Sequence, residues 1–321
     1  MKLRPLGRSG IEVAPLAFGG NVFGWTVDQP SAFRLLDTFT GNGFNLVDTA
    51  DVYSKWAPGN SGGESETVIG HWIALGGARR EKLVLATKVG MEMPGGKKGL
   101  SREYIAQAVE DSLKRLKTDR IDLYQAHAED PATPIDETLE AFSRLVRDGK
   151  VRAIGASNFA AASLDKADQA AKAHGWPRFE TLQPEYNLYS RQKYEQELAP
   201  ACERLGIGVI PYFGLARGFL SGKYRTDADV SQSPRGASIK TTYMNPRGMK
   251  ILDALDEVAK SKRAKCSQVA LAWLMSRPTI TAPIASATTV SQLRELIGGI
   301  ELRLDPEATA ALDKASAWRE A

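Results

Sequence analysis

Four residues of the types that transfer protons stand where short apolar segments of the chain end. Asp48, Lys88 and His127 each close such a segment, and Tyr53 follows Asp48 by five residues. A tyrosine has a pKa of about 10, which makes it a weak proton donor at neutral pH. A lysine ammonium held by an aspartate would lower that pKa, so the phenol could protonate a carbonyl oxygen. A neutral histidine beside it would donate a hydrogen bond to the same oxygen.

The four residues include no nucleophile with an adjacent base, so acyl transfer matches them poorly. They suit proton delivery to an oxygen while a nicotinamide delivers a hydride to the carbon. Each also has an ordinary structural explanation, such as a helix cap for Asp48 or a packing aromatic for Tyr53. Their joint placement at successive strand ends favours the catalytic interpretation.

The spacing of apolar residues predicts the elements that position these side chains. Amphipathic stretches at 101–116 and 134–148 predict helices, the second followed by Gly149 as a left-handed C-cap. Short runs rich in Val, Ile and Leu predict eight buried strands. The predicted strands are residues 16–20, 45–49, 83–89, 121–127, 151–156, 181–184, 207–212 and 279–285.

Alternation of strands and helices predicts an α/β fold with parallel strands and right-handed crossovers. Eight strands favour a closed (β/α)8 TIM barrel over an open, doubly wound sheet. The GxGxxG fingerprint of dinucleotide-binding open sheets does not occur in the chain. In a barrel the active site lies at the C-terminal ends of the strands, where the four residues would meet.

The remaining segments complete a single predicted domain over residues 1–321. Residues 3–15 predict a small β-hairpin before the barrel, which extends over about 16–300, and residues 301–321 predict a helical tail. Residues 213–247 are weakly periodic and contain Gly, Ser and Arg. We interpret them as a long loop at the C-terminal face that acts as a lid or binding loop.

Composition narrows the function classes. The 321 residues are 43% hydrophobic and 25% charged, with a net charge of +4, as in a globular enzyme. Charges are scattered, so no nucleic-acid partner is expected. No segment suits a signal peptide or a membrane span, and Cys202 and Cys266 predict neither a disulfide framework nor a zinc site. We therefore expect a cytoplasmic protein that acts on small molecules without a metal; the oligomeric state stays open.

Several motifs in this order resemble the aldo-keto reductases. The similarity begins with GFNLVDTADVY at 43–53 and GESETVIG at 63–70, joined through an insertion at 55–62 that is longer than usual in the family. It continues through 121–130, 149–159, 182–187 and 212–223 and so covers nearly the whole chain. Within this family the chain resembles the bacterial reductases related to the potassium-channel beta subunits.

The resemblance implies a (β/α)8 barrel with an N-terminal hairpin that binds NADP(H) without a Rossmann domain. It implies that Tyr53 is the general acid, that Lys88 and Asp48 tune it, and that His127 orients the carbonyl group. It implies cofactor contacts along the following strand ends and the long loop. These are Ser157, Asn158 and Gln183 for the carboxamide, Tyr212 for the nicotinamide ring, and Leu215, Gly218 and Lys223 for the pyrophosphate.

One departure from the family concerns the cofactor's 2′-phosphate. Thr288, Thr289 and Gln292 stand where members with a strong NADPH preference carry Lys or Arg. Hydroxyls such as that of Ser286, and the start of the following helix, could still bind a phosphate. Glu295 matches the family position that contacts adenine. NADP(H) is therefore expected from the family, and NAD(H) remains possible.

Trp25 and Trp56 are the predicted substrate-binding residues, beside Tyr53 and His127. An aromatic lining favours aromatic or extended aldehydes and ketones, with broad specificity. Two alternatives to a carbonyl reductase remain. A cofactor-binding sensor or auxiliary subunit with slow turnover could keep the same residues, and so could an NAD-dependent sugar or alcohol dehydrogenase. An aldolase using Lys88 as a Schiff-base nucleophile would leave Asn158 and Gln183 without a role.

Overall fold

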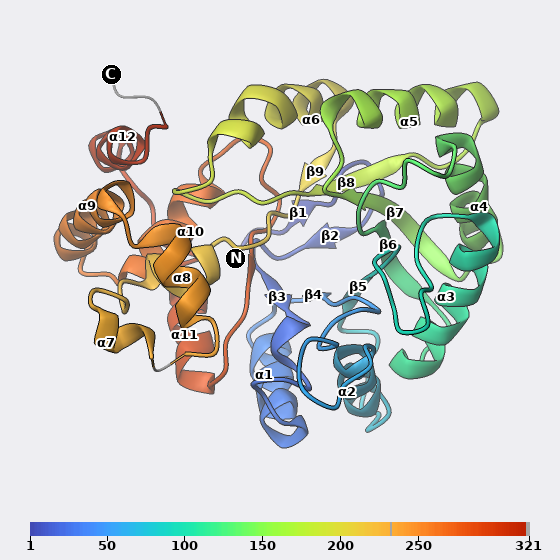
Figure 1. Ribbon diagram of the computed structural model, residues 1–321, viewed down its shortest axis with the longest axis horizontal. Coiled ribbons are helices and arrows are strands. Elements are labelled where there is room, and N and C mark those ends of the chain that lie inside the picture. The colour runs from blue at the N-terminus through green and yellow to red at the C-terminus, as the bar shows by residue number, and fades with distance from the viewer. Residues whose placement is uncertain (232, 319–321) are drawn as a thin grey trace.

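Eight parallel strands form the centre of this computed structural model, which describes residues 1–231 and 233–318 (Figure 1). They are hydrogen-bonded in the order β10, β3, β4, β5, β6, β7, β8, β9, and each overlaps one predicted segment. Their bounds are β3 Ala17–Gly19, β4 Leu46–Asp48, β5 Val84–Val89, β6 Ile121–Ala126, β7 Val151–Ser157, β8 Phe179–Gln183, β9 Gly208–Val209 and β10 Ile284–Ala285.

Backbone hydrogen bonds between β9 and the segment leading into β10 close the ring. Val209 accepts from the N–H of Thr281 at 2.8 Å and donates to the carbonyl of Thr279 at 3.1 Å. The N–H of Ile284 donates to Pro211 at 2.9 Å. The predicted (β/α)8 barrel is confirmed. The last strand is shorter than its predicted range because residues 279–283 reach β9 only through such isolated bonds.

Side chains alternate between the inside and the outside of the barrel along each strand. Ala17, Leu46 and Leu123 belong to a hydrophobic cluster inside the barrel. Their neighbours Phe18 and Val47 belong to the larger cluster that packs against the helices. Almost every position of these strands is buried, with Arg152 on β7 and Glu180 on β8 as exceptions, and therefore the strands are rich in apolar residues on both faces.

The predicted N-terminal hairpin is confirmed. β1 (Arg4–Pro5) and β2 (Glu12–Val13) pair antiparallel. Leu6, Ile11 and Val13 join the cluster inside the barrel. The hairpin therefore covers the end of the barrel at which the strands begin, leaving the opposite end for the site.

Helices surround the strands (Figure 1). The helix predicted at 101–116 is confirmed, with the Ser101 hydroxyl accepting from the N–H of Tyr104 at 3.3 Å, and Gly149 takes the predicted left-handed conformation with φ 74°. The larger helices are α1 Gln29–Gly41, α2 Glu64–Ile73, α3 Arg102–Leu116, α4 Ile135–Arg147, α5 Ala161–His174, α6 Ala199–Leu205, α9 Pro246–Lys262, α10 Cys266–Met275, α11 Val290–Gly298 and α12 Pro306–Ala315. Over the described ranges, the structure contains no helix suited by length and apolarity to crossing a membrane.

The structure corrects the prediction for one segment of the chain and covers only part of another. The 213–247 segment is not one loop: it contains the short helices η3 (Ala216–Ser221), α7 (Asp227–Val230) and α8 (Gly236–Tyr243). These helices are too short to show periodicity, and a tertiary contact supports them, since the rings of Phe219 and Tyr243 stack at 5.5 Å. The predicted tail at 301–321 contains α12, and its residues 319–321 lie outside the described part.

Candidate active site

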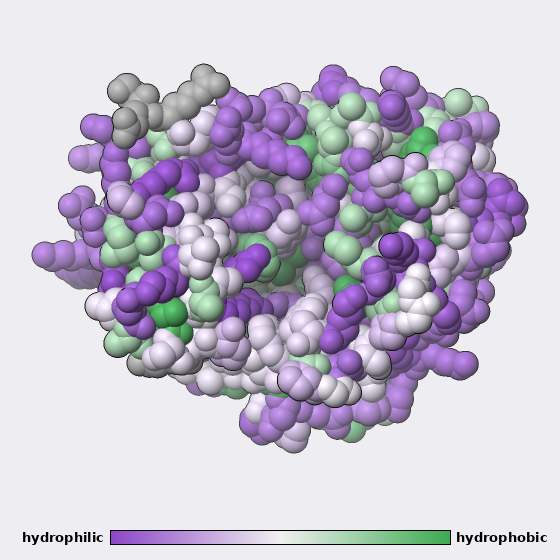
Figure 2. Space-filling model, in the orientation of Figure 1, coloured by the Kyte–Doolittle hydropathy of each residue, from purple (hydrophilic) through white to green (hydrophobic). Residues whose placement is uncertain are grey.

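Alternation along the strands brings polar side chains together at the C-terminal end of the barrel. Asp48 shares the inward parity of Leu46 on β4, and Lys88 shares that of Ala86 on β5. Seen in the orientation of Figure 1, the surface is hollowed near its centre, and hydrophobic residues lie in the hollow (Figure 2). The strand ends therefore supply a group of polar side chains, the catalytic floor, at this end of the barrel.

The catalytic floor consists of Asp48, Tyr53, Lys88 and the residues that contact them, and the Lys88 ammonium lies at its centre. Its Nζ donates hydrogen bonds to Asp48 Oδ2 at 2.7 Å, to the carbonyl of Thr49 at 2.7 Å and to the phenol oxygen of Tyr53 at 3.0 Å. The Lys88 side chain is 0% exposed. An ammonium has three donors, and all three are used here, so Lys88 is fixed in position.

Burial raises the pKa of Tyr53 above its ordinary value, and Asp48 adds to this, while the Lys88 ammonium acts in the opposite direction. The prediction of a lowered phenol pKa is therefore wrong in its net sign, because burial outweighs the nearby cation. Burial also acts to lower the pKa of Lys88, but Asp48 and Tyr53 outweigh it and the pKa is raised. The result is a charged lysine beside a phenol that keeps its proton, which is the form able to donate.

His127 follows β6 and faces Tyr53 from the next part of the ring. The two ring centroids are 5.9 Å apart at an angle of 69°. Burial, and then the charge of Lys88, hold the pKa of His127 well below its usual range, so the imidazole is neutral. Its Nδ1 has no hydrogen-bond partner within the described residues. A neutral imidazole in this place can donate a hydrogen bond to an oxygen held near Tyr53.

The residues predicted for the carboxamide and ring form one hydrogen-bonded group. Asn158 has a left-handed backbone with φ 57°, and its Nδ2 donates to the carbonyl of His127 at 3.0 Å. Its Oδ1 accepts from the Tyr212 hydroxyl at 2.9 Å. Ser157 Oγ donates to the carbonyl of Gln183 at 2.9 Å. These contacts set Asn158 and Tyr212 beside the histidine.

Asp48 has two further partners that connect the floor to the other strands. Gln183 Nε2 donates to Asp48 Oδ1 at 2.9 Å, and Gln125 Nε2 approaches the same oxygen at 3.3 Å. Gln183 thus contacts the aspartate directly. The sequence analysis did not identify Gln125. Its position two residues before His127 places it on the same, inward side of the strand, and this spacing could have identified it.

The residues predicted for the pyrophosphate lie around η3: Leu215 directly before it, Gly218 within it and Lys223 after it. Gly218 has φ 100°, and its two preceding residues Ala216 and Arg217 also have positive φ. Lys223 Nζ lies 5.0 Å from the ring centre of Tyr224. The N–H groups of Ala216 and Gly218 donate to the carbonyls of Phe213 and Leu215 at 2.6 Å and 2.8 Å, so these bonds stabilise the tight turn of the loop.

Two arginines at this mouth were missed by the sequence reasoning. The Arg217 guanidinium lies over the Phe213 ring at 4.7 Å, and that of Arg235 lies over Trp25 at 5.1 Å. Neither is paired with a carboxylate of the described chain. Burial and the charge of Arg217 lower the pKa of Arg235. The arginine content of the long loop was the signal that could have identified them.

The residues after β10 are held by local bonds. Ser286 Oγ lies 2.7 Å from both the carbonyl of Gly19 and Asn21 Oδ1. Gln292 Oε1 accepts from the N–H of Thr288 at 2.9 Å at the start of α11. Glu295 is hydrogen-bonded to Ser267 on α10. Ser286 and Gln292 therefore lie at the same corner, whereas the Glu295 carboxylate is directed to a neighbouring helix.

The predicted substrate-binding tryptophans contact each other and the phenol. Trp25 and Trp56 meet edge to face at 5.8 Å, and Trp56 lies 5.9 Å from the Tyr53 ring. Trp56 is 47% exposed, an unusual value for so large an apolar side chain. A hollow of about 530 Å³ lies between the Trp25 loop and Thr288. The aromatic pair thus connects the catalytic floor to the corner at α11.

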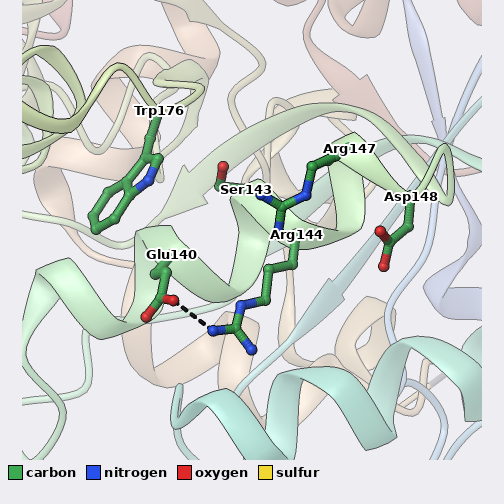
Figure 3. Close-up of a pocket in the computed structure, with 6 residues that line it drawn as sticks. All are labelled: Glu140, Ser143, Arg144, Arg147, Asp148 and Trp176. Carbon is green, nitrogen blue, oxygen red and sulfur yellow. Dashed lines mark hydrogen bonds and ion pairs between the residues drawn. The ribbon is translucent and has the colours of Figure 1, made fainter.

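A second hollow, of about 350 Å³, lies away from the strand ends. It is lined by polar side chains of α4 together with Trp176, and Glu140 accepts a hydrogen bond from Arg144 there (Figure 3). No predicted site residue lines it. It is therefore separate from the candidate active site.

Comparison with known proteins agrees with this fold. The profile of the Aldo/keto reductase family matches residues 15–317. "Uncharacterized oxidoreductase YrpG" of Bacillus subtilis (strain 168) is 40% identical over 320 residues, covering 98% of this chain and 95% of that protein. "Probable voltage-gated potassium channel subunit beta" of Arabidopsis thaliana is 32% identical, covering 94% and 92%. "Versiconal hemiacetal acetate reductase" of Aspergillus parasiticus is 29% identical, covering 98% and 96%.

The barrel and these matches define an oxidoreductase. The chain belongs to the Aldo/keto reductase family, which confirms the resemblance predicted from its motifs, including the likeness to channel beta subunits.

Proposed function

We propose that the protein reduces aldehydes and ketones reversibly to alcohols with NADP(H), using Tyr53 as the general acid and base. The observation that carries this proposal is the hydrogen bonding of one buried ammonium, Lys88, to both Asp48 and Tyr53. A protonated phenol beside a fixed cation is suited to give up its proton as negative charge develops on a carbonyl oxygen.

The residues around the mouth fit a nicotinamide dinucleotide. Asn158 and Tyr212 would hold the nicotinamide end, and the guanidinium groups of Arg217 and Arg235 would hold the phosphates. Lys223 would add a further cation on the same side. The two unpaired guanidinium groups offer the positive charge that the residues after β10 lack. When bound, the nicotinamide supplies the hydride to the carbonyl carbon.

The chain's own residues handle the proton and the orientation. The neutral His127 donates a hydrogen bond to the carbonyl oxygen and turns the carbon toward the cofactor side of the pocket. Tyr53 transfers its proton to that oxygen, and Lys88 stabilises the phenolate that remains. Trp25 and Trp56 would cover the organic part of an aromatic or extended substrate.

The test is loss of reduced-nicotinamide absorbance with a nitrobenzaldehyde, measured in parallel with NADPH and NADH. Consumption of either cofactor that needs the aldehyde supports the reductase. Consumption with NADH equal to or faster than with NADPH would favour an NAD-dependent dehydrogenase instead.

A slow cofactor-binding subunit is the second candidate. It is favoured by the similarity to a protein named as a potassium channel subunit beta, which covers most of both chains. Tight NADPH binding without aldehyde-dependent oxidation within minutes would select this candidate over the reductase.

A further inference from the structure

A second group of buried polar side chains lies behind the catalytic floor, on the outside of the barrel. Thr87 on β5 and Tyr124 on β6 alternate with the inward residues Lys88 and Gln125, so they face the helices. We call this group the outer cluster. It consists of Asp51, Glu66, Thr87, Tyr104, Arg115 and Tyr124, of which all but Tyr104 and Arg115 are buried.

One of the two carboxylates in the outer cluster is fully compensated. Glu66 on α2 is 0% exposed, and its Oε2 accepts from Arg115 Nε at 2.7 Å. Its Oε1 accepts from the Thr87 hydroxyl at 2.6 Å. Glu66 therefore has a cation and a hydroxyl as partners, which is the compensation that a buried carboxylate requires.

The other carboxyl group, that of Asp51, has no such compensation. Asp51 is 2% exposed, and neither of its carboxyl oxygens has a hydrogen-bond partner within the described residues. Burial and the charge of Glu66 raise its pKa to about 8, against the charges of Arg115 and Lys88. At neutral pH this carboxyl group keeps its proton, which removes the cost of a buried, unpaired anion.

Asp51 is close in sequence and in backbone contact to the residues of the catalytic floor. It lies three residues after Asp48 and two before Tyr53, and its N–H donates to the carbonyl of Lys88 at 3.3 Å. The Lys88 ammonium acts to lower the pKa of Asp51. Because a charge–charge interaction is reciprocal, a change in the charge of Asp51 also acts on the Lys88 ammonium, and through it on Tyr53.

We propose that Asp51 is a positioning residue that acts on the Tyr53 phenol through Lys88, and that ionisation of Asp51 sets the alkaline limit of carbonyl reduction. This inference rests on the proposed reductase function. The groups that face Asp51 are Glu66 from α2, Arg115 and Tyr104 from α3, Lys88 from β5 and Tyr124 from β6.

The sign of the effect follows from the charges. A neutral Asp51 leaves the full effect of the Lys88 ammonium available to a developing phenolate. An ionised Asp51 places a second negative charge behind Lys88, which makes the phenolate less favourable and Tyr53 a weaker acid. Reduction should therefore slow as the pH rises through the value at which Asp51 loses its proton.

The experiment compares the pH profile of kcat/KM for aldehyde reduction in the wild type and in Asp51→Asn. We expect the wild-type value to fall about threefold or more between pH 7 and pH 9, as a coupling near one pKa unit implies, and the Asp51→Asn value to stay within about twofold. Asp168→Asn is the matched control, because Asp168 is a buried carboxylate on α5, far along the chain. It should keep the wild-type profile.

Two outcomes would overturn the proposal. One is an unchanged alkaline fall in Asp51→Asn. The other is a loss of activity at every pH in a variant with a normal unfolding transition, which would mean that the ionised form is the one required. If Asp51→Asn does not fold, Asp51→Ser carries the same expectation.

A second readout separates this proposal from the reductase assignment. Infrared difference spectra of wild type minus Asp51→Asn at neutral pH should contain the carbonyl band of a protonated carboxyl group, and the band should vanish by pH 10. If the wild type reduces no aldehyde, the proposed function fails, and the presence or absence of this band decides the state of Asp51. Its absence at neutral pH would overturn the inference by itself.

Discussion

The Nζ atom of Lys88 lies 3.0 Å from the phenol oxygen of Tyr53 and donates a hydrogen bond to it from a fully buried position. The same nitrogen lies 4.6 Å from the centre of the Tyr53 ring. Because Asp48 and the Thr49 carbonyl hold the other two donors, the ammonium cannot turn away from the phenol. The position of the ammonium therefore allows it to stabilise the phenolate that forms when Tyr53 gives up its proton.

Tyr53→Phe should abolish aldehyde reduction and leave cofactor binding nearly unchanged. Loss of a general acid costs about 10²- to 10⁴-fold in rate, while the ring and its packing remain. The measurements are kcat/KM for reduction and the dissociation constant for NADPH by fluorescence. Tyr189→Phe is the control, since it also removes a hydroxyl that makes one hydrogen bond, to Asn245. A Tyr53→Phe enzyme as fast as the wild type would exclude Tyr53 as the acid.

Lys88→Met should remove activity and also destabilise the fold. It leaves Asp48 as a buried carboxylate with only amide partners, and breaking a buried ion pair in this way costs about 3–5 kcal/mol. Adding Asp48→Asn should recover much of the free energy of unfolding, because the unpaired charge disappears, without restoring reduction. Denaturant unfolding and initial rates measure the two effects. Full stability in Lys88→Met alone would contradict the proposed cost of an unpaired Asp48.

The architecture could be predicted from the sequence because apolar runs and helical periodicity are local signals. Eight strands in the right places, the hairpin and the helix at 101–116 all follow from such patterns. The helices α7 and α8 could not be found in this way. They depend on contacts such as that between Phe219 and Tyr243, which are close in space but far apart in the chain.

The candidate site was predictable only in part, for a similar reason. The strand-end rule identified Asp48, Lys88 and His127 as neighbours, because parallel strands end at one face. It could not give the net direction of the Tyr53 pKa, which depends on how deeply the ring is buried. Nor could it identify Arg235, whose place over Trp25 follows from how a distant loop folds back.

His127→Gln should keep the fold and slow reduction by about 10²-fold. The imidazole is held neutral by burial and by Lys88, so its contribution is one hydrogen bond to the carbonyl oxygen rather than a charge. For the same reason kcat/KM of the wild type should show no histidine-dependent step between pH 6 and pH 7. Steady-state profiles over that range test both statements, with His174→Gln on the exposed end of α5 as the control. A step near pH 6.5 that disappears in His127→Gln would mean that the imidazole becomes charged.

Asp51→Asn should stabilise the protein, and increasingly so as the pH rises. The pKa of Asp51 is raised from 3.8 to about 8 on folding, so the wild type is penalised between those values and the penalty is complete above the upper one. The difference in free energy of unfolding should therefore grow by up to about 1.4 kcal/mol per pH unit over this window. Asp168→Asn should destabilise instead, because Asp168 is paired with Lys172 at 2.6 Å and with Arg178 at 3.5 Å. A difference that does not vary with pH would contradict the raised pKa.

Gln292→Arg should shift the cofactor preference toward NADPH. The Gln292 side chain lies at the start of α11, where its Oε1 accepts from the N–H and hydroxyl of Thr288. A helix N-terminus favours a phosphate, and a guanidinium there would add bidentate, charge-assisted hydrogen bonds. We expect the ratio of kcat/KM for NADPH to that for NADH to rise about tenfold, as about 1.4 kcal/mol of added binding implies. Gln107→Arg on the exposed face of α3 adds the same charge elsewhere and should leave the ratio unchanged. An equal shift in both variants would assign the effect to net charge, and no shift in Gln292→Arg would place the 2′-phosphate away from α11.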